Sequence, residues 1–363
     1  MNVLVLPYNI ASLSAITAEA LNKIEGVHAR SLTVEMHKYQ MVNSSTICLP
    51  MVVSKRKPLK WVWNKITFKR KLYQQMKWAD VIHYQWGTVF PDHADLKWAA
   101  RSGKPIFIEW IGSEIRIPDL CKKLNPYYAS VFDKGYEYYK LESNNRSLEV
   151  QKIFKSAGAI PLIFPEMSIY VKKDIFPVTY PSQVRLNISN FVPAYPSPDT
   201  KRPLIVHSPT AKICKGTDII LPVINQLKEI LDFDFVLLHD MTREQVHEMM
   251  RKADIYLDQV IVGSHGMATV EAMALGKPVM CYIMKEVFEG GLPADCPIVN
   301  TNPDNLKEQL VKLITNAQLR HDVGRQSRIF AEKNFDADKI SVQLVNIYKE
   351  VLEAKKNTHA KTA

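Results

Sequence analysis

Two segments in the second half of the chain combine lysine, glycine and hydroxyl residues, which are residue types that suit phosphate binding. The first, residues 207–218, directly follows an apolar run and contains Thr210, Lys212, Lys215 and Gly216. The two ammonium groups could neutralise a diphosphate, and Gly216 would let the chain turn closely into a helix. The segment lacks the GxxxxGK[ST] spacing of a Walker loop, and no GxGxxG motif follows any apolar run. The alternative is a solvated turn before a capped helix.

The second segment, residues 263–279, predicts a helix that begins at an anion-binding terminus. Gly266 would open this helix, which would run to about Leu275, and Gly276 is a typical stop signal. Free N–H groups at residues 266–268 would attract an anion, and the helix dipole would strengthen the attraction. Glu271 lies about one turn into the helix, where it could accept hydrogen bonds from ribose hydroxyls. The alternative is an ordinary core helix with a solvated Glu271.

Both segments need a scaffold that presents them at one edge of a sheet. Short apolar runs alternate with helical spacing in both halves of the chain, which predicts parallel sheets with helices on both faces. The expected strands are residues 3–6, 28–33, 81–84, 106–109, 159–164, 204–207, 235–239, 255–257, 279–282 and 298–299. A proline-rich linker at 193–203 separates the halves. We therefore expect two doubly wound α/β domains whose carboxyl strand ends face a cleft.

Composition and charge limit the remaining classes. The 363 residues are 47% hydrophobic and 23% charged, which argues against collagen, coiled coil and wholesale disorder. A net charge of +10 favours anionic ligands or an anionic membrane surface. The five cysteines form no CxxC pair, so neither a disulfide scaffold nor a zinc site is expected. No apolar run is long enough for a spanning helix, and the apolar N-terminus is interpreted as a strand and helix, not as a signal peptide.

The motifs at 207–218, 253–259 and 266–279 together resemble the nucleotide-sugar-binding half of family 4 glycosyltransferases, which have the GT-B fold. They read H-x-P-x-x-x-x-x-K-G-T-D, A-D-I-x-L-D-Q and G-x-x-x-x-E-A-M-A-L-G-K-P-V. The resemblance implies two Rossmann-like domains, an acceptor-binding domain at 1–195 and a donor-binding domain at 196–340. An amphipathic helix and polar tail at 341–363 would follow, with the tail at 355–363, and this helix could pack back on the first domain.

The resemblance also implies roles for the candidate site residues. Lys215, with Lys212, would hold the donor diphosphate, and the backbone of residues 265–268 would bind the distal phosphate. Glu271 would bind the ribose, and residues 239–241 would line the base pocket. The donor-binding candidates are Thr210, Lys212, Lys215, Gly216, His239, Met241, His265, Gly266, Met267, Ala268 and Glu271. Such enzymes need neither a metal nor a cofactor, and they usually transfer the sugar with retention of its anomeric configuration.

In the first half, residues 110–116 resemble the G-S-D-I-R turn of the family's acceptor domain, with Glu114 in place of the aspartate. Glu114 could position an acceptor hydroxyl or the donor sugar. The candidate catalytic residues are therefore Lys215, Glu271 and Glu114. At the end of another expected strand, His83 and Gln85 could also reach the cleft. The acceptor-side candidates are His83, Gln85, Gly112, Ser113, Glu114 and Arg116. The alternatives are a structural His83 and a surface ion pair between Glu114 and Arg116.

Residues 55–77 form a basic stretch that contains no acidic residue and is interleaved with Trp61, Trp63, Phe68 and Tyr73. This composition suits an anionic membrane surface, where each Lys or Arg contributes on the order of 1 kcal/mol. A solvated helix is the alternative, and a nucleic-acid partner is not expected. We expect a cytoplasmic protein that could attach peripherally to the inner face of the membrane.

The sequence thus predicts a retaining glycosyltransferase that moves a sugar from a UDP- or GDP-linked donor to a glycan or lipid-linked acceptor, as in cell-surface polysaccharide synthesis. One alternative is a nucleotide-sugar epimerase or a phosphorylase of similar architecture. Another is a non-catalytic nucleotide-sugar-binding or scaffold subunit. The second alternative draws support from Gly263 and Ile111, which stand where the family typically has a glutamate and a histidine.

Overall fold

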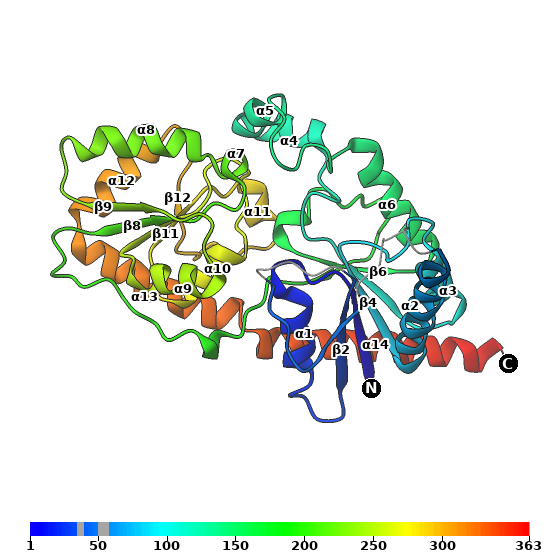
Figure 1. Ribbon diagram of the computed structural model, residues 1–363. Coiled ribbons are helices and arrows are strands. Elements are labelled where there is room, and N and C mark those ends of the chain that lie inside the picture. Colours follow the sequence, from blue (N-terminus) through cyan, green and yellow to red (C-terminus); the bar gives the residue numbers. More distant parts are fainter. Residues whose placement is uncertain (35–39, 50–57, 363) are drawn as a thin grey trace.

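Two parallel sheets form the centres of two lobes that lie side by side (Figure 1). The computed structural model describes residues 1–34, 40–49 and 58–362. Every strand pair in both sheets is parallel. Parallel strands need crossover connections, and helices supply most of them here. The predicted fold class of two doubly wound α/β domains is confirmed.

The N-terminal lobe contains a seven-stranded sheet in the order β3-β2-β1-β4-β5-β6-β7. Its strands are β1 (Asn2–Pro7), β2 (His28–Thr33), β3 (Thr46–Cys48), β4 (Val81–Gln85), β5 (Ile106–Glu109), β6 (Ile160–Ile163) and β7 (Tyr180–Pro181). Its helices are η1 (Ile10–Ser12), α1 (Leu13–Leu21), α2 (Pro58–Trp78), α3 (Ala94–Arg101), α4 (Pro118–Leu124), α5 (Pro126–Phe132), α6 (Asn144–Ser156), η2 (Pro165–Met167) and η3 (Ile188–Asn190). The side chains of Val3, Leu4, Val5 and Leu6 are fully buried, as expected for a strand covered on both faces.

The C-terminal lobe contains a five-stranded sheet in the order β12-β11-β10-β8-β9. Its strands are β8 (Leu204–His207), β9 (Asp234–Leu237), β10 (Ile255–Leu257), β11 (Val279–Cys281) and β12 (Val299–Asn300). Its helices are α7 (Lys212–Lys215), α8 (Thr217–Lys228), α9 (Arg243–Lys252), α10 (Met267–Ala274), α11 (Lys285–Glu289), α12 (Leu306–Thr315) and α13 (Ala317–Asn334). The proline-rich linker is fixed to this lobe, because Ala194 N donates to Leu275 O at 2.9 Å.

The last helix, α14 (Ala337–Thr362), leaves the C-terminal lobe and runs along the N-terminal lobe (Figure 1). Ile340 and Leu344 on α14 share a hydrophobic cluster with Val3 and Phe107 of the first sheet. The chain therefore crosses between the lobes twice, once through the linker and once before α14. Residues 355–362, expected as a polar tail, continue the helix.

Some strands in the structure differ in their bounds from the strands that the sequence predicts. The strand expected at 235–239 is β9, which begins at Asp234 and ends at Leu237. His239 therefore lies in the loop after the strand, where it is followed by Asp240 at a φ of 55°. The short strands β3 and β7 were not predicted, because two or three residues carry no readable alternation.

Candidate functional site

The carboxyl edge of the second sheet brings the lysine-bearing segment and α10 together on one carboxylate. Residues 211–216, which we call the donor turn, contain α7 and end at Gly216. Lys215 Nζ donates a hydrogen bond to Asp258 Oδ1. Thr269, in the first turn of α10, donates through Oγ1 to Asp258 Oδ2. The two elements predicted to bind phosphate therefore lie side by side, and Asp258 connects them.

Both members of the Lys215–Asp258 pair are charged. The side chain of Lys215 is 16% exposed and that of Asp258 is 1% exposed. Burial lowers the pKa of Lys215, but the Asp258 carboxylate outweighs burial and raises this pKa above its usual value. Burial raises the pKa of Asp258, and the ammonium of Lys215 more than reverses this. The ammonium has three N–H donors, so an anionic ligand can share it with Asp258.

Gly216 allows the donor turn to pack against the loop that follows β10. Its φ is +78°, and a Cβ atom there would lie 2.6 Å from Val260 Cγ2 and 2.9 Å from Ile261 Cγ1. Val260 N donates to Lys215 O at 3.2 Å across the same contact. The glycine of the K-G-T-D motif is therefore required by both the backbone conformation and the close approach.

Gln259 organises the loop between β10 and α10. This residue ends the A-D-I-x-L-D-Q motif, but the sequence alone indicated no role for it. Gln259 Oε1 accepts from Ile261 N at 3.1 Å and from Val262 N at 2.7 Å. Gln259 Nε2 donates to Ser264 O and, at 3.1 Å, to Tyr282 O. This one side chain therefore shapes the loop between β10 and α10 and so sets where α10 begins.

Glu271 lies in α10 with both carboxylate oxygens engaged by α9. Oε1 accepts from Arg243 Nη2 at 2.7 Å, and Oε2 lies 3.2 Å from His247 Nε2. Burial raises the pKa of Glu271, but His247 and Arg243 lower it below its usual value. The carboxylate is therefore ionised and a strong acceptor for hydroxyl groups. Sequence reasoning missed Arg243 and His247, although their four-residue spacing on one helix face was a readable signal.

Arg243 also connects the two lobes, because its Nη1 donates to Ser12 Oγ of the N-terminal lobe at 3.1 Å. Beside it, a cavity of about 450 Å³ lies between α1, α9 and the segment that joins the lobes. Its lining includes Ile16, Leu186, Phe191, Arg243, His247 and Leu275. The partners of Glu271 therefore border an interlobe space.

Gly263, which stands where the family has a second glutamate, occupies a position that rejects any side chain. Its φ is +80°, and a Cβ atom would lie 2.3 Å from Met284 Cγ and 2.7 Å from Met284 Sδ. The carboxylate is therefore missing for a structural reason, because the backbone and Met284 fill its place.

Replacing Gly263 by alanine should lower the stability of the fold. A left-handed conformation costs a non-glycine residue roughly 1–2 kcal/mol, and overpacking typically adds about 1–3 kcal/mol. Thermal unfolding measures the effect. Gly87→Ala is the matched control, because nothing lies within 4 Å of a Cβ atom there. Equal unfolding temperatures for the two variants would contradict this account of Gly263.

The prediction that His83 or Gln85 reaches the cleft is wrong, since both side chains are fully buried. His83 Nδ1 lies 2.7 Å from the Tyr348 hydroxyl of α14, and Gln85 Nε2 donates to Glu109 Oε2 at 2.7 Å. Arg185 completes this network with two hydrogen bonds to Glu109. Burial raises the pKa of Glu109, but Arg185 and His83 hold it well below its usual value. The network is structural and holds α14 against the first sheet.

The turn at residues 110–116 uses its charged side chains internally. Glu114 accepts from the backbone N–H groups of Ile111 and, at 3.0 Å, Gly112. Burial raises the pKa of Glu114 to about 7, although these backbone hydrogen bonds oppose the rise. Arg116 is buried and pairs with Glu142, so the alternative of a surface ion pair between Glu114 and Arg116 is wrong. Glu114 therefore closes this turn by accepting its backbone N–H groups. Gly112 and Ser113, in the same turn, are half-buried.

The remaining predicted residues differ in accessibility. Thr210, Lys212 and Gly266 are exposed, whereas Met241, Met267 and Ala268 are half-buried. The side chain of His239 is 56% exposed. The side chain of His265 turns away from the surface, with Nε2 lying 2.7 Å from Glu166 Oε1 of the N-terminal lobe.

His207 is structural, because its Nδ1 lies 2.8 Å from Leu257 O and its Nε2 lies 2.9 Å from Thr217 Oγ1. Burial lowers the pKa of His207 to about 4, so this ring is neutral at pH 7. It ties the end of β8 to the end of β10 and to the start of α8.

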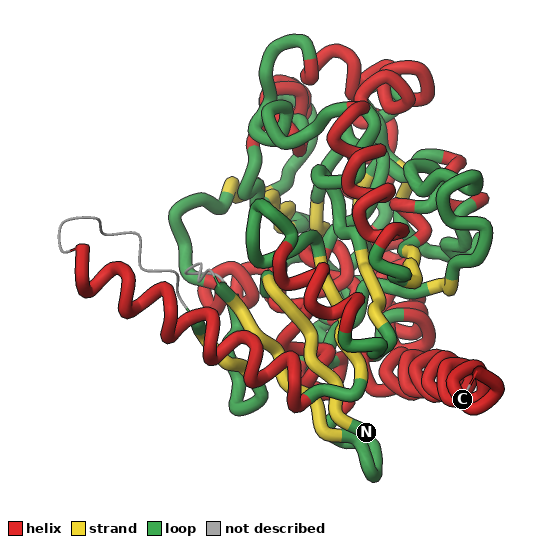
Figure 2. The backbone as a smooth tube through the Cα atoms, turned by 90° about the vertical axis from the view of Figure 1, so that its right-hand side faces the viewer, coloured by secondary structure: helices red, strands yellow, loops and turns green. Residues whose placement is uncertain are grey.

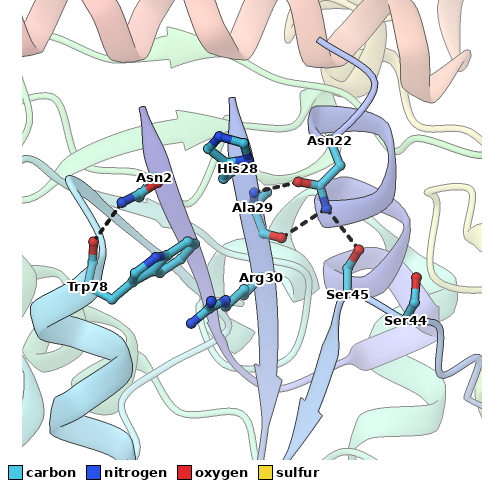
Figure 3. Close-up of a pocket in the computed structure, with 8 residues that line it drawn as sticks. All are labelled: Asn2, Asn22, His28, Ala29, Arg30, Ser44, Ser45 and Trp78. Carbon is cyan, nitrogen blue, oxygen red and sulfur yellow. Dashed lines mark hydrogen bonds between the residues drawn. The ribbon is translucent and has the colours of Figure 1, made fainter. Parts of the chain in front are cut away.

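A second cavity, of about 410 Å³, lies at the edge of the first sheet where its parallel strands begin, the amino edge (Figure 3). It is lined by Asn2 and His28, which begin β1 and β2, and by Trp78, which ends α2. Amino ends of parallel strands face away from the ligand edge of such sheets, so this cavity is not the candidate site. Within the described part of the chain, no group of three or more His, Cys, Asp or Glu side chains could hold a metal ion.

Comparisons with known proteins show which family model and which folds the chain is similar to. Residues 226–330 match the family model of glycosyl transferases group 1. An uncharacterized glycosyltransferase of Methanocaldococcus jannaschii, MJ1178, is 27% identical over 167 residues, which are 38% of this chain and 45% of that protein. The chain thus spans less than half the length of this curated relative.

Solved structures match over almost the whole chain. The structure of a sucrose-phosphate synthase from Thermosynechococcus elongatus superposes with a TM-score of 0.64 at 13% identity, covering 97% of this chain and 99% of that one. A complex of S. aureus MnaA with UDP superposes with a TM-score of 0.50 at 15% identity, covering 97% of this chain and 96% of that one. These matches confirm the resemblance predicted from the sequence: the chain has the GT-B fold, and residues 226–330 match the model of glycosyl transferases group 1.

Proposed function

We propose that the protein transfers a sugar from a UDP- or GDP-linked donor to a glycan or lipid-linked acceptor, with retention of the anomeric configuration. The observation that carries this proposal is the convergence of Lys215 and the N-terminus of α10 on Asp258. Lys215 supplies a positive charge and the N-terminus of α10 supplies free N–H groups at the same sheet edge. Together they suit a leaving group with two phosphates. The complex of the similar S. aureus fold with UDP supports the same ligand class.

In the proposed reaction, the bond between the anomeric carbon and the diphosphate oxygen breaks while the acceptor oxygen bonds to that carbon on the same face. The acceptor proton leaves with the departing diphosphate. Lys215, Lys212 and the N–H groups that begin α10 would stabilise the diphosphate charge, which is usually the largest catalytic contribution. Glu271 would bind the ribose, and residues 239–241 would border the base. We propose that no metal is needed, because the lysines and the helix terminus supply the compensating charge.

A thermal-shift screen with UDP, GDP, UMP, GMP and their diphosphate sugars tests the donor site. A nucleoside diphosphate should raise the unfolding temperature more than the matching monophosphate, since the second phosphate reaches the shared site. Transfer from the stabilising donor to glycan and lipid-linked acceptors, in EDTA, then tests the reaction. Equal shifts for monophosphate and diphosphate would contradict the proposed site. Binding without transfer would favour the non-catalytic subunit.

The basic face of α2 supports a membrane-associated acceptor. Lys65, Lys69, Arg70, Lys71 and Lys77 are exposed, while the other face of α2 buries Leu72 and Met76 in the core. Figure 2 shows α2, which follows the grey trace, along the outside of the N-terminal lobe. The basic residues at 55–57 lie outside the described part. None of the described helices has the length and hydropathy to cross a bilayer. We propose that this face attaches to anionic lipid.

Replacing Lys69, Arg70 and Lys71 together by glutamine should release the protein from anionic vesicles. Each basic residue near such a surface contributes about 1 kcal/mol, so affinity should fall on the order of a hundredfold. Co-sedimentation with vesicles of phosphatidylglycerol and phosphatidylcholine measures this, and pure phosphatidylcholine vesicles are the control. Undiminished sedimentation of the triple variant would refute attachment through α2.

A further inference from the structure

Glu137 belongs to the N-terminal lobe, in the segment between α5 and α6, yet its carboxylate binds the donor turn of the other lobe. Ile213 N donates to Glu137 Oε1 at 2.8 Å, and Cys214 N donates to Glu137 Oε2 at 2.9 Å. Sequence reasoning gave Glu137 no role, since 76 positions separate it from its first partner.

The surrounding contacts place this whole segment against the C-terminal lobe. Asn125, which caps α5, also donates through Nδ2 to Ile261 O at 2.7 Å. Tyr127, the second residue of α5, packs edge-on against Tyr282 of the C-terminal lobe, with their ring centroids 5.4 Å apart. Figure 1 shows α5 and α4 beside α7. Glu137 is therefore one of several contacts between this segment and the loops at the candidate site.

The two N–H groups that donate to Glu137 lie at the start of α7. N–H groups at the start of a helix have no acceptor within the helix. A carboxylate is a favourable cap here because each of its two oxygens accepts one of these N–H groups in a charge-assisted hydrogen bond. The N-cap residue of α7, Ala211, makes no side-chain hydrogen bond, so Glu137 of the other lobe takes the place of a local side-chain cap. The last residue of α7 is Lys215, so the cap fixes the backbone that carries the donor-site ammonium.

We infer that Glu137 is a positioning residue for the donor: it caps the donor turn only when the two lobes are closed, and it thereby couples donor binding to closure. This inference rests on the proposed function for its donor. The apparent affinity of a ligand that needs the closed form is reduced by the fraction of molecules that are closed. Removing the Glu137 cap lowers that fraction and leaves the reacting groups unchanged.

The test compares Glu137→Ala, Glu137→Gln and Glu149→Ala, the last being an exposed carboxylate on α6 of the same lobe. We expect Glu137→Ala to raise the donor KM and the dissociation constant for UDP or GDP about tenfold, with kcat changed less than twofold. The Glu137→Gln amide oxygen can still accept a hydrogen bond, so that variant should be intermediate. Glu149→Ala should match the parent protein.

Small-angle scattering of the same variants without nucleotide separates this inference from the proposed function. The radius of gyration should increase in Glu137→Ala and stay unchanged in Glu149→Ala, because the lobes open when the cap is lost. If the parent protein bound neither UDP nor GDP, the proposed function would fail while the scattering comparison would still test the cap. An unchanged radius of gyration together with unchanged nucleotide affinity in Glu137→Ala would overturn the inference.

Discussion

The double variant Lys215→Met with Asp258→Asn is expected to fold normally and to lose roughly 10²–10³-fold in kcat. Groups that stabilise a developing anion in an enclosed site have effects of about this size. The second substitution is needed because removal of one member of a buried ion pair leaves an uncompensated charge and costs about 3–5 kcal/mol. Asparagine at 258 can still accept the hydrogen bond from Thr269.

Initial rates of sugar release from the donor measure this effect, and thermal unfolding verifies that the double variant is folded. Lys201→Met is the matched control, since it removes an exposed lysine from the linker. It should leave kcat unchanged. A kcat for the double variant within threefold of the parent value would show that Lys215 does not stabilise the leaving group.

Glu271→Gln is expected to weaken donor binding about tenfold to a hundredfold, which corresponds to about 1.4–2.7 kcal/mol. The amide keeps the size of the side chain but loses the charge that Arg243 and His247 hold in place. Because burial alone would raise the pKa of Glu271, these two partners are what keep it an anionic acceptor for hydroxyl groups.

Calorimetry with a pair of ligands isolates the ribose contact. The parent protein should bind a nucleoside diphosphate much more tightly than its 2′,3′-dideoxy analogue, which lacks the ribose hydroxyls. Glu271→Gln should discriminate between the two ligands much less than the parent does, since a neutral amide oxygen is a weaker acceptor for the hydroxyls than the carboxylate. If the variant still discriminated between the two ligands as strongly as the parent, the ribose would have another partner.

The sequence could predict the two sheets and the donor turn because their signals are local. Apolar runs mark β1 and β8, and the Lys215-Gly216 pair is contiguous with its strand and helix. The start of α10 at Met267, with Gly266 before it, was likewise readable from a glycine and a helical repeat. The helix that ends the chain was predicted from its apolar face, although it extends further than that face indicated.

The partners of the site could not be read in the same way, because they are set by contacts between distant segments. A polar side chain at a strand end looks the same whether it faces a ligand or a buried arginine, and Arg185 lies 76 positions from the Glu109 that it pairs with. For this reason His83 and Gln85 were assigned to the cleft. The close approach of Met284 to Gly263 is another long-range contact that no local pattern reveals.

A crystal structure of the protein with bound UDP or GDP tests most directly whether the donor turn and α10 serve one leaving group. The account predicts that the diphosphate lies within hydrogen-bonding distance of Lys215 Nζ and of the N–H groups that begin α10, with the ribose on Glu271. A diphosphate that contacted only one of the two elements, or lay at the amino edge of either sheet, would contradict it.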